Sequence, residues 1–119
     1  MKDQFTLVRE LIDSADVAMY LKDADGRILA VNDRVAALWG SSKEQLVGKS
    51  DPDFATREDA QRIHEMDQKV LDSNAPMTFR LTVTTPRGKV DLFDHKFPVH
   101  LDDRTTGIGG VAIEASKIQ

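Results

Sequence analysis

Cysteine is absent from the sequence of 119 residues. A disulfide framework, a thiolate zinc site, an iron–sulfur cluster and a cysteine-linked chromophore are therefore excluded, because each of them is attached through a cysteine sulfur. The absence suits a reducing compartment, and we expect a cytoplasmic protein.

Positive charge and long apolar runs are also scarce. Lys and Arg number 16 against 20 Asp and Glu, which gives a formal net charge of -4. A protein that binds a phosphate backbone needs a basic stripe, so we expect no nucleic-acid partner. No apolar run approaches the roughly 18 residues that span a bilayer, and residues 1–14 lack the apolar core of a signal peptide. We therefore expect no membrane contact by this domain.

The composition that remains is typical of one folded domain, with 40% hydrophobic and 30% charged residues. The first 14 residues have a helical pattern in which Phe5, Val8, Leu11 and Ile12 lie along one side. Such a stripe covers either its own domain or a second copy of the protein, and the pattern does not decide between the two. We take the stripe as the candidate dimer contact.

Strand signals occur in two groups along the chain. Asp25-Gly26 marks a tight hairpin in the first group. Two strands precede the main helices and three follow them. The five predicted strands cover residues 17–22, 27–31, 78–84, 90–100 and 108–114.

Helix signals fill the segment between these groups. Asn32 offers a side-chain acceptor to the next helix, either Ser41 or Ser42 caps a short one, and Thr56 opens the longest, over residues 57–72. This order predicts an α+β fold: a five-stranded antiparallel sheet, helices packed on one face, and an N-terminal flanking helix. Such a layout leaves a cavity between the sheet and the longest helix.

Several short motifs occur in a characteristic order. They are D-x-D-G-R-I at 23–28, L-W-G at 38–40, E-x-L-V-G-K-S at 44–50 with DPDF after it, D-x-x-V-L at 67–71, K-F-P-V at 96–99 and the final strand G-I-G-G-V-A-I-E. With these motifs and the capping Asn32, the chain resembles a PAS domain over nearly all of its length after the first helix. Members of this family often end the last strand with Asp-Ile-Thr, where this chain has Glu114, Ala115 and Ser116.

The resemblance implies a sensory or regulatory module, often dimeric, within a larger bacterial signalling protein. The subgroup that it resembles lies upstream of sensor histidine kinases and cyclic-dinucleotide enzymes. We accordingly expect a flanking helix at 1–14, a sensory domain at 15–116, and at 117–119 the start of a linker to an output domain, a kinase or a cyclase.

Asp67 is the strongest polar candidate for the cavity, because it shares the inner face of its helix with Ile63 and Val70. A carboxylate in that position must find a hydrogen-bond donor or shift its pKa. A structural hydrogen bond and contact with a ligand both remain open. His64, beside Ile63, is the candidate for a haem ligand on this helix, but neither haem nor flavin is expected.

The strand at 90–100 supplies further candidates. His95 shares its parity with Phe93 and Phe97, so if that side faces inward, His95 points into the cavity. The candidate ligand-binding residues are His64, Asp67, Phe79, Phe93, His95 and Phe97. The ligand is an unknown small molecule, and no cofactor or metal is expected.

Three functions are compatible with these features. The first is a sensory module that binds a small molecule in the cavity and relays the signal through a homodimer. The second is a ligand-free dimerisation and relay module, whose cavity is filled by Phe79, Phe93, Phe97, Met19 and Met66. The third is a small enzyme in which Asp67 and His95 converge. We favour the first and expect no catalysis.

Overall fold

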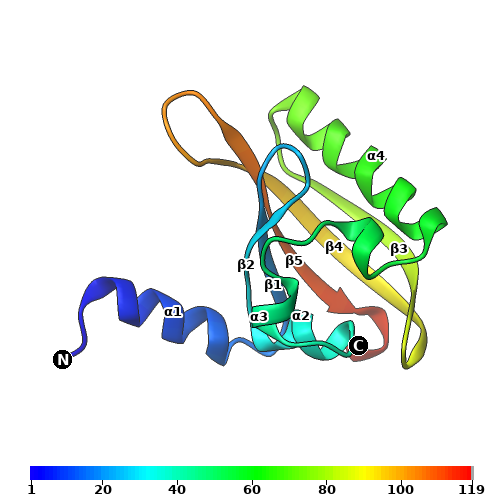
Figure 1. The fold of residues 1–119 in the computed structure, drawn as a ribbon, viewed down its shortest axis with the longest axis horizontal. Coiled ribbons are helices and arrows are strands. Elements are labelled where there is room, and N and C mark those ends of the chain that lie inside the picture. Colours follow the sequence, from blue (N-terminus) through cyan, green and yellow to red (C-terminus); the bar gives the residue numbers. More distant parts are fainter. Residues whose placement is uncertain (119) are drawn as a thin grey trace.

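A five-stranded antiparallel sheet forms the centre of the structure, a computed structural model that describes residues 1–118 (Figure 1). The strand order is β2-β1-β5-β4-β3, so the last strand of the chain lies in the middle of the sheet. The predicted fold class is confirmed. The strands are β1 (Ala18–Lys22), β2 (Ile28–Val31), β3 (Met77–Thr85), β4 (Gly88–His100) and β5 (Thr106–Glu114).

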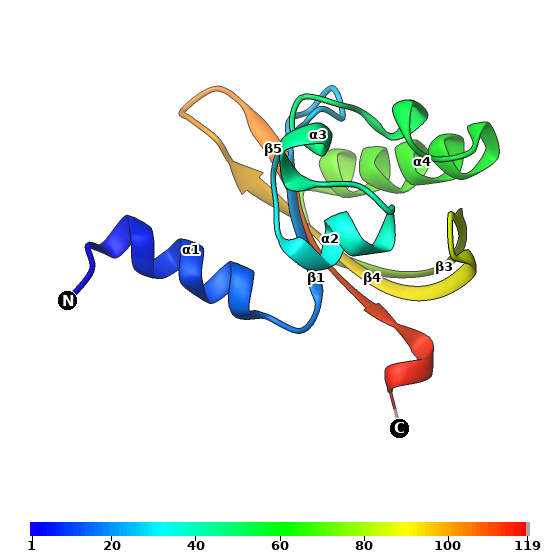
Figure 2. The same ribbon diagram turned by 60° about the horizontal axis from the view of Figure 1, so that its bottom comes forward.

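Helices cover one face of this sheet. Figure 2 shows α2, α3 and α4 on the same side, whereas α1 projects away from the rest of the domain. Two 3-10 turns, η1 and η2, have no counterpart in the sequence predictions. The helices are α1 (Gln4–Ser14), α2 (Asp33–Leu38), α3 (Lys43–Leu46) and α4 (Arg57–Ser73), and the 3-10 turns are η1 (Asp51–Asp53) and η2 (Ala115–Lys117).

The predicted turns and caps determine where these elements begin. Gly26 has a φ of 89°, which a hairpin turn needs and which other residues rarely adopt. The side chain of Thr56 accepts a hydrogen bond from the backbone N–H of Asp59, as predicted for the start of α4. Of the two serine candidates, Ser42 is the one that caps α3. Local signals therefore position the helices against the sheet.

Asn32 has a larger role than the predicted helix cap. Its side-chain oxygen accepts from the backbone N–H of Val35, at 3.3 Å, and from that of Met19, at 3.0 Å. Its amide nitrogen donates to the carbonyl oxygens of Ile12, at 2.9 Å, and Val17, at 2.8 Å. One fully buried side chain thus joins α1, β1 and α2.

The apolar stripe of α1 is largely uncovered by the domain. Phe5 and Leu11 are 72% and 71% exposed, Val8 is exposed, and Ile12 is half-buried. Apart from the hydrogen bond to Asn32, α1 is linked to the domain through Asp13, whose carboxylate lies 3.4 Å from Lys43 Nζ. The stripe therefore does not cover its own domain, which was one of its two possible roles.

Two groups of buried side chains fill the space between the sheet and the helices. One joins Ile28 and Val31 of β2 to α2 and α3, and the other joins Ile63 of α4 to the inner faces of β3 and β4. Small residues occupy the inner face near the middle of the sheet, where Ala18, Gly110 and Ala112 lie. Their size leaves space above the sheet, and that space is the site described next.

Candidate functional site

A cavity of about 60 Å³ lies between the sheet and the helices. Most of its wall is apolar, and one end is charged. The apolar wall is formed by Ala18, Ile28, Val35, Leu38, Trp39, Phe54, Ile63, Leu81, Val83, Leu92 and Ala112. The charged end is formed by Tyr20, Lys22, Asp51, Asp94 and Lys96.

The charged end belongs to a network of six side chains, which we call the charge cluster: Tyr20, Lys22, Asp51, Asp67, Asp94 and Lys96. Lys22 Nζ lies 3.0 Å from Asp51 Oδ2 and 2.8 Å from Asp67 Oδ2. Lys96 Nζ lies 2.9 Å from Asp67 Oδ1 and 3.1 Å from Asp94 Oδ2. Asp67 thus connects the two lysines.

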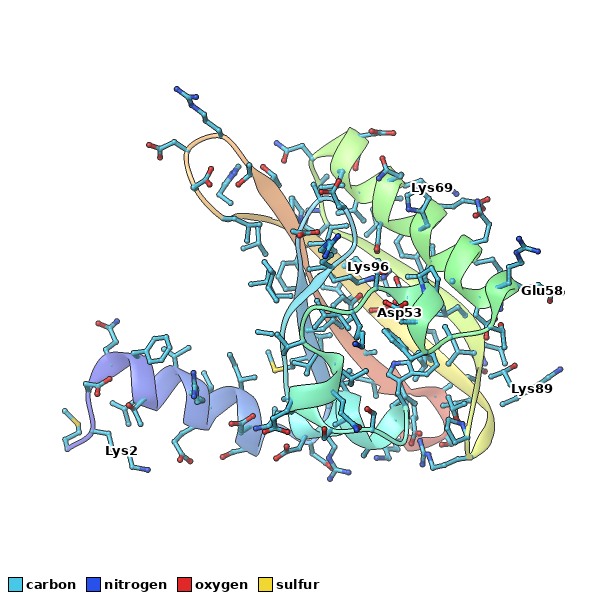
Figure 3. The ribbon with its side chains drawn as sticks, in the orientation of Figure 1. Lys2, Asp53, Glu58, Lys69, Lys89 and Lys96 are labelled. Atoms are coloured by element: carbon cyan, nitrogen blue, oxygen red, sulfur yellow. The ribbon has the colours of Figure 1, made fainter. Side chains whose placement is uncertain are left out.

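Burial distinguishes this cluster from surface ion pairs. The side chains of Lys96 and Lys22 are 1% and 5% exposed, and those of the three aspartates are between 7% and 11% exposed. Figure 3 shows Lys96 at the centre of the domain. Ions in such a position are tolerated only when they are paired, because removing them from water is expensive.

Tyr20, on β1 with Lys22, completes the cluster. Its hydroxyl donates to Asp94 Oδ1, at 2.9 Å, and accepts from Lys96 Nζ, at 2.8 Å. Tyr20 and Lys96 are both paired with Gly110, which lies between them on the central strand. A Cβ atom on Gly110 would lie 2.0 Å from the tyrosine ring, so the missing side chain is what lets Tyr20 reach across β5.

One carboxylate oxygen of the cluster is held by an ion pair alone. Asp67 Oδ1 is buried and accepts no hydrogen bond within the described part of the chain. Lys96 Nζ is close to it, at 2.9 Å, but this contact is an ion pair and not an aligned hydrogen bond. A buried oxygen with spare hydrogen-bonding capacity is unusual in a folded protein.

The cluster changes the proton affinity of its members. Burial alone would lower the pKa of Lys22, but the carboxylates of Asp51 and Asp67 outweigh that effect and raise it. Burial alone would likewise lower the pKa of Lys96, but the carboxylates of Asp94 and Asp67 outweigh that effect and raise this pKa above its ordinary value. Burial raises the pKa of the Tyr20 hydroxyl well above its ordinary value, and the charge of Asp94 adds to this. Both lysines therefore stay charged and Tyr20 stays neutral at physiological pH.

These shifts make the fold sensitive to alkali. The folded protein retains protons on Lys22, Lys96 and Tyr20 that the unfolded chain releases near pH 10, so this stability is complete below about pH 10 and is lost as pH rises towards the folded pKa values. Urea unfolding between pH 8 and pH 11.5 should give a free energy of unfolding that falls above pH 10. The Tyr20→Phe variant should have a slope shallower by about 1.4 kcal/mol per pH unit, since one proton is removed. A free energy that stays constant up to pH 11.5 would contradict this assignment.

The structure places one of the predicted ligand-binding residues in this cluster. Asp67 lies on the inner face of α4, as predicted, and its partners are lysines and not the backbone donors that the sequence had suggested. Phe79 is half-buried and does not line the cavity. His64 is exposed and lines an outer cleft together with Asp51 and Asp67. Whether any of them binds a ligand stays a prediction.

The predicted orientation of β4 is wrong. Leu92, Asp94 and Lys96 face the cavity, so Phe93, His95 and Phe97 lie on the opposite face of the sheet. There the His95 ring bonds to the hydroxyl of Thr78 and lies beside the Phe97 ring. The aromatic residues point outward because Gly109 leaves space for Phe97 on the outer face, where a Cβ atom would lie 2.5 Å from the ring. Asp67 and His95 are therefore separated by the sheet and do not form a catalytic pair.

Sequence reasoning missed every member of the charge cluster except Asp67, namely Tyr20, Lys22, Asp51, Asp94 and Lys96. The available signal was the parity of β4, on which Leu92, Asp94 and Lys96 alternate with the aromatic residues. Opposite charges two residues apart on one side of a strand are close enough to pair. The prediction took Phe93 and Phe97 as core residues, and it therefore assigned the wrong face of β4 to the cavity.

Metal binding and membrane crossing are two further possibilities for residues 1–118. No group of three or more histidine, cysteine or acidic side chains in that range is arranged to hold a metal ion. Within the same range, none of the helices combines the length and the apolar character needed to cross a bilayer.

The sheet, the helices on one face and the cavity between them define an α+β domain with an internal cavity. The sequence profile of the PAS fold family matches residues 12–119, and the chain belongs to this family. The predicted resemblance is confirmed. A PAS domain is a sensory module and is not itself catalytic.

Known relatives agree with this assignment. The aerobic respiration control sensor protein ArcB of Escherichia coli K12 is 25% identical over 93 residues, which cover 78% of this chain and 12% of ArcB. The chain thus spans about an eighth of the length of that relative. This relationship supports a signalling role for the domain.

Solved structures show the same fold at low sequence identity. The PAS domain of a Colwellia psychrerythraea protein superposes with a TM-score of 0.80 at 19% identity, covering 98% of this chain and all of that one. The Vibrio cholera VqmA–ligand–DNA complex superposes with a TM-score of 0.85 at 15% identity, covering 98% of this chain and 53% of VqmA.

Proposed function

We propose that this domain is the sensory module of a bacterial signal-transduction protein, that it binds a small molecule in the cavity, and that it relays the signal through a homodimer. The output domain of such a protein is a histidine kinase or a cyclic-dinucleotide enzyme. A cytoplasmic location, expected from the sequence, stays part of this proposal.

The observation that carries the proposal is the charged end of the cavity. A structural core of this size is more stable when apolar side chains fill it, because buried ion pairs seldom repay their desolvation. Retaining five buried ionisable groups beside an open cavity suits a site that recognises a polar ligand. VqmA, whose fold is similar, is itself seen with a ligand.

A route for the signal is supported by strand pairing. The start of β1 is paired with the end of β5, Ala18 with Ala112, so the chain enters and leaves the sheet at the same end. Tyr20 lies two residues after Ala18 on the inner face. A ligand that moves Tyr20 would shift the start of β1 and the end of β5. It would thereby change the positions of α1, which precedes β1, and of η2, which follows β5.

Glu114 stands at the exit of β5. Its carboxylate accepts from Arg87, at 2.7 Å, and lies 3.6 Å from Lys117 Nζ. The hydrogen bond from Arg87 lowers the pKa of Glu114. An acidic residue that holds the β3–β4 turn to the exit segment supports a coupling role at the position where family members often carry aspartate.

The dimer contact that we propose is the apolar stripe of α1. The stripe faces a groove on the same side of the domain, to which Leu29 of β2 and Val47 contribute exposed apolar surface. A second copy that covered Phe5, Val8 and Leu11 would remove them from water at about 25 cal/mol per Å² of apolar area.

Native mass spectrometry of the untreated purified protein, with an absorption spectrum of the same sample, tests ligand binding. An additional mass that is lost on denaturation is the expected result, and a visible band would reassign the ligand to flavin or haem. A protein that carries no additional mass when purified, and that gains none from a small-molecule extract of the host cells, would contradict the ligand proposal.

Light scattering tests the dimer. The intact chain should have the mass of a dimer, and a variant that lacks residues 1–14 should have the mass of a monomer, because the stripe is lost. The double variant Phe5→Ser and Leu11→Ser keeps the helix and should also be monomeric. A truncated variant that remains dimeric would exclude α1 as the contact.

The small size of the cavity favours the second candidate function, a ligand-free relay, but the residues predicted to fill the cavity do not line it: Phe79, Phe93, Phe97, Met19 and Met66. Sites for drug-sized ligands usually measure about 300–1,000 Å³, and the cavity measures about 60 Å³. A ligand must therefore be very small, or the cavity must open. The relay module would show the dimer mass, no bound compound and no response of the cavity side chains to any added small molecule.

A further inference from the structure

The charged lining of the cavity is electrically balanced. It contains two ammonium groups and two carboxylates, those of Lys22, Lys96, Asp51 and Asp94. The third carboxylate of the charge cluster, on Asp67, does not line the cavity and is paired with both lysines. An ion that entered the cavity would leave water and find every charge of the lining already paired, which is costly. The lining therefore favours an uncharged ligand.

Lys22 has a hydrogen-bond donor to spare. An ammonium group has three N–H donors. Two of those on Lys22 are directed to Asp51 Oδ2, at 3.0 Å, and to Asp67 Oδ2, at 2.8 Å, and residues 1–118 supply no third acceptor. The Tyr20 ring, whose centroid is 5.3 Å away, attracts the charge but does not take up this donor. Lys96, by contrast, has three oxygen neighbours, at 2.8, 2.9 and 3.1 Å, one for each N–H.

Asp51 has the matching acceptor. Its Oδ2 atom accepts from Lys22, whereas its Oδ1 atom has no donor within the described part of the chain. An open donor and an open acceptor thus belong to one ion pair of 3.0 Å that lines the cavity. A ligand that bonds to both needs an acceptor and a donor on neighbouring atoms. An amide has this arrangement, because its carbonyl oxygen and its N–H group share one carbon.

The rest of the cavity limits the size and the polarity of the ligand. A volume of about 60 Å³ corresponds to roughly two water molecules at about 30 Å³ each, so it holds a molecule of about three or four non-hydrogen atoms. Apolar side chains such as Ile63, Leu81 and Val83 form the wall away from the cluster. A zwitterion is also neutral overall, but both of its ions would leave water for a mostly apolar cavity. The ligand therefore has one uncharged polar end and a short apolar end.

We propose that the cavity binds a small uncharged amide, whose carbonyl oxygen accepts from Lys22 Nζ and whose N–H donates to Asp51 Oδ1. The alkyl group of the amide lies against Leu81 and Val83. This ligand class rests on the proposed sensory function of the same cavity. A ketone of equal size lacks the donor. A carboxylate or an amidinium ion of equal size has a charge that the lining does not match.

The polar end of the cavity is also the end beside the outer cleft. Asp51 lines both the cavity and the cleft, and it is the first residue of η1. Displacement of this three-residue turn would join the cleft to the charged end of the cavity. An amide that entered by this route would meet its two hydrogen-bonding partners first.

Four probes of matched shape test the ligand class on the full chain: acetamide, acetone, acetate and acetamidinium. Methyl NMR at neutral pH reports binding through Leu81, Val83 and Leu92, whose side chains line the cavity. Probes of this size bind weakly, so they are added at millimolar concentration. Acetamide should shift the cavity methyl signals. It should leave the signals of Leu7 unchanged, because this side chain is exposed on α1.

The four probes should bind in a defined order. Acetamide should saturate the shifts at a concentration at least about tenfold lower than acetone, which corresponds to the value of one hydrogen bond to a charged group. Acetate and acetamidinium should each bind at least about tenfold more weakly than acetamide, because each brings an unmatched charge into the cavity.

Two matched variants test the role of the lining charges. In Asp51→Asn, acetate beside Lys22 would restore the negative charge that the substitution removes. Acetate should therefore bind this variant at least about tenfold more tightly than the unaltered protein. Asp53→Asn makes the same change on the same turn, where the side chain is exposed and outside the lining (Figure 3), and it should leave the order of the probes unchanged. The comparison of the four probes stands alone if Asp51→Asn does not fold.

Each other outcome overturns part of the inference. If acetone binds as tightly as acetamide, Asp51 does not accept from the ligand, and the amide class is wrong while the sensory cavity stands. If acetate or acetamidinium binds as tightly as acetamide, the charge balance does not select the ligand, and the inference fails in the same way. If only a compound of another class shifts the cavity methyl groups, the inference alone fails. If no compound shifts them, the inference and the proposed ligand-binding function fail together.

Discussion

Replacing Lys96 with methionine should lower the free energy of unfolding by about 3–5 kcal/mol, the usual result of removing one partner from a buried ion pair. Methionine fills much of the same volume, so the loss is electrostatic and not a cavity. Lys22 alone would then face the three carboxylates of the cluster, and Asp94 would retain only the hydroxyl of Tyr20. The side chain that has the smallest exposed fraction among the charged residues of the cluster is thus the one whose charge matters most.

Lys89→Met is the matched control for this prediction. Lys89 lies on the same strand, β4, but its side chain is exposed at the edge of the domain (Figure 3). The same substitution there should change the free energy of unfolding by less than about 0.5 kcal/mol. Urea unfolding of both variants at pH 7 makes the comparison. A loss below 1 kcal/mol for Lys96→Met would show that the cluster is not formed as described.

Asn32→Ala should have the second largest effect, a loss of about 2–4 kcal/mol. The loss of a helix cap accounts for about 1 kcal/mol of this. The remainder arises because the carbonyl oxygens of Ile12 and Val17 lose their donor and the N–H of Met19 loses its acceptor. Thermal and urea unfolding measure the total.

Thr56→Ala separates the two contributions. Thr56 caps α4 through one hydrogen bond, to the N–H of Asp59, and so it tests the value of a cap alone. We expect a loss of about 1 kcal/mol for this variant. Asn32→Ala should also make α1 more accessible to limited proteolysis, whereas Thr56→Ala should leave it unchanged. Equal losses of stability for the two variants would mean that Asn32 acts only as a cap.

Local features of the fold could be predicted from the sequence because they are encoded over a few residues. Asn32 and Thr56 identify helix starts since a short polar side chain reaches the free N–H groups of the next turn. The hairpin at Gly26 needs positive φ, which narrows the choice of residue. The helix and strand boundaries follow from these positions within a few residues.

The site was harder to predict than these local features, because it depends on residues that are far apart in the sequence. Lys22 and Lys96 are 74 positions apart, and each looks like a surface residue on its own. Asp67 attracted attention because it lies on an apolar helix face, but nothing local identifies its partners. The orientation of β4 depends on glycines of the neighbouring strand, which a pattern within β4 does not contain.

The attachment of α1 at one end has a mechanical consequence. The helix has 11 residues and is therefore about 16 Å long, and the contacts of Asn32 and Lys43 are near its C-terminal end. A tilt of about 10° at that end would move the far end by about 3 Å, from the same helical dimensions. The helix therefore acts as a lever. Its pivot is Ile12, whose carbonyl oxygen accepts from Asn32, and Asn32 in turn accepts from the N–H of Met19 in β1. A displacement at that pivot too small to unpack the core would thus be enlarged several-fold at the far end of α1, in the proposed dimer contact.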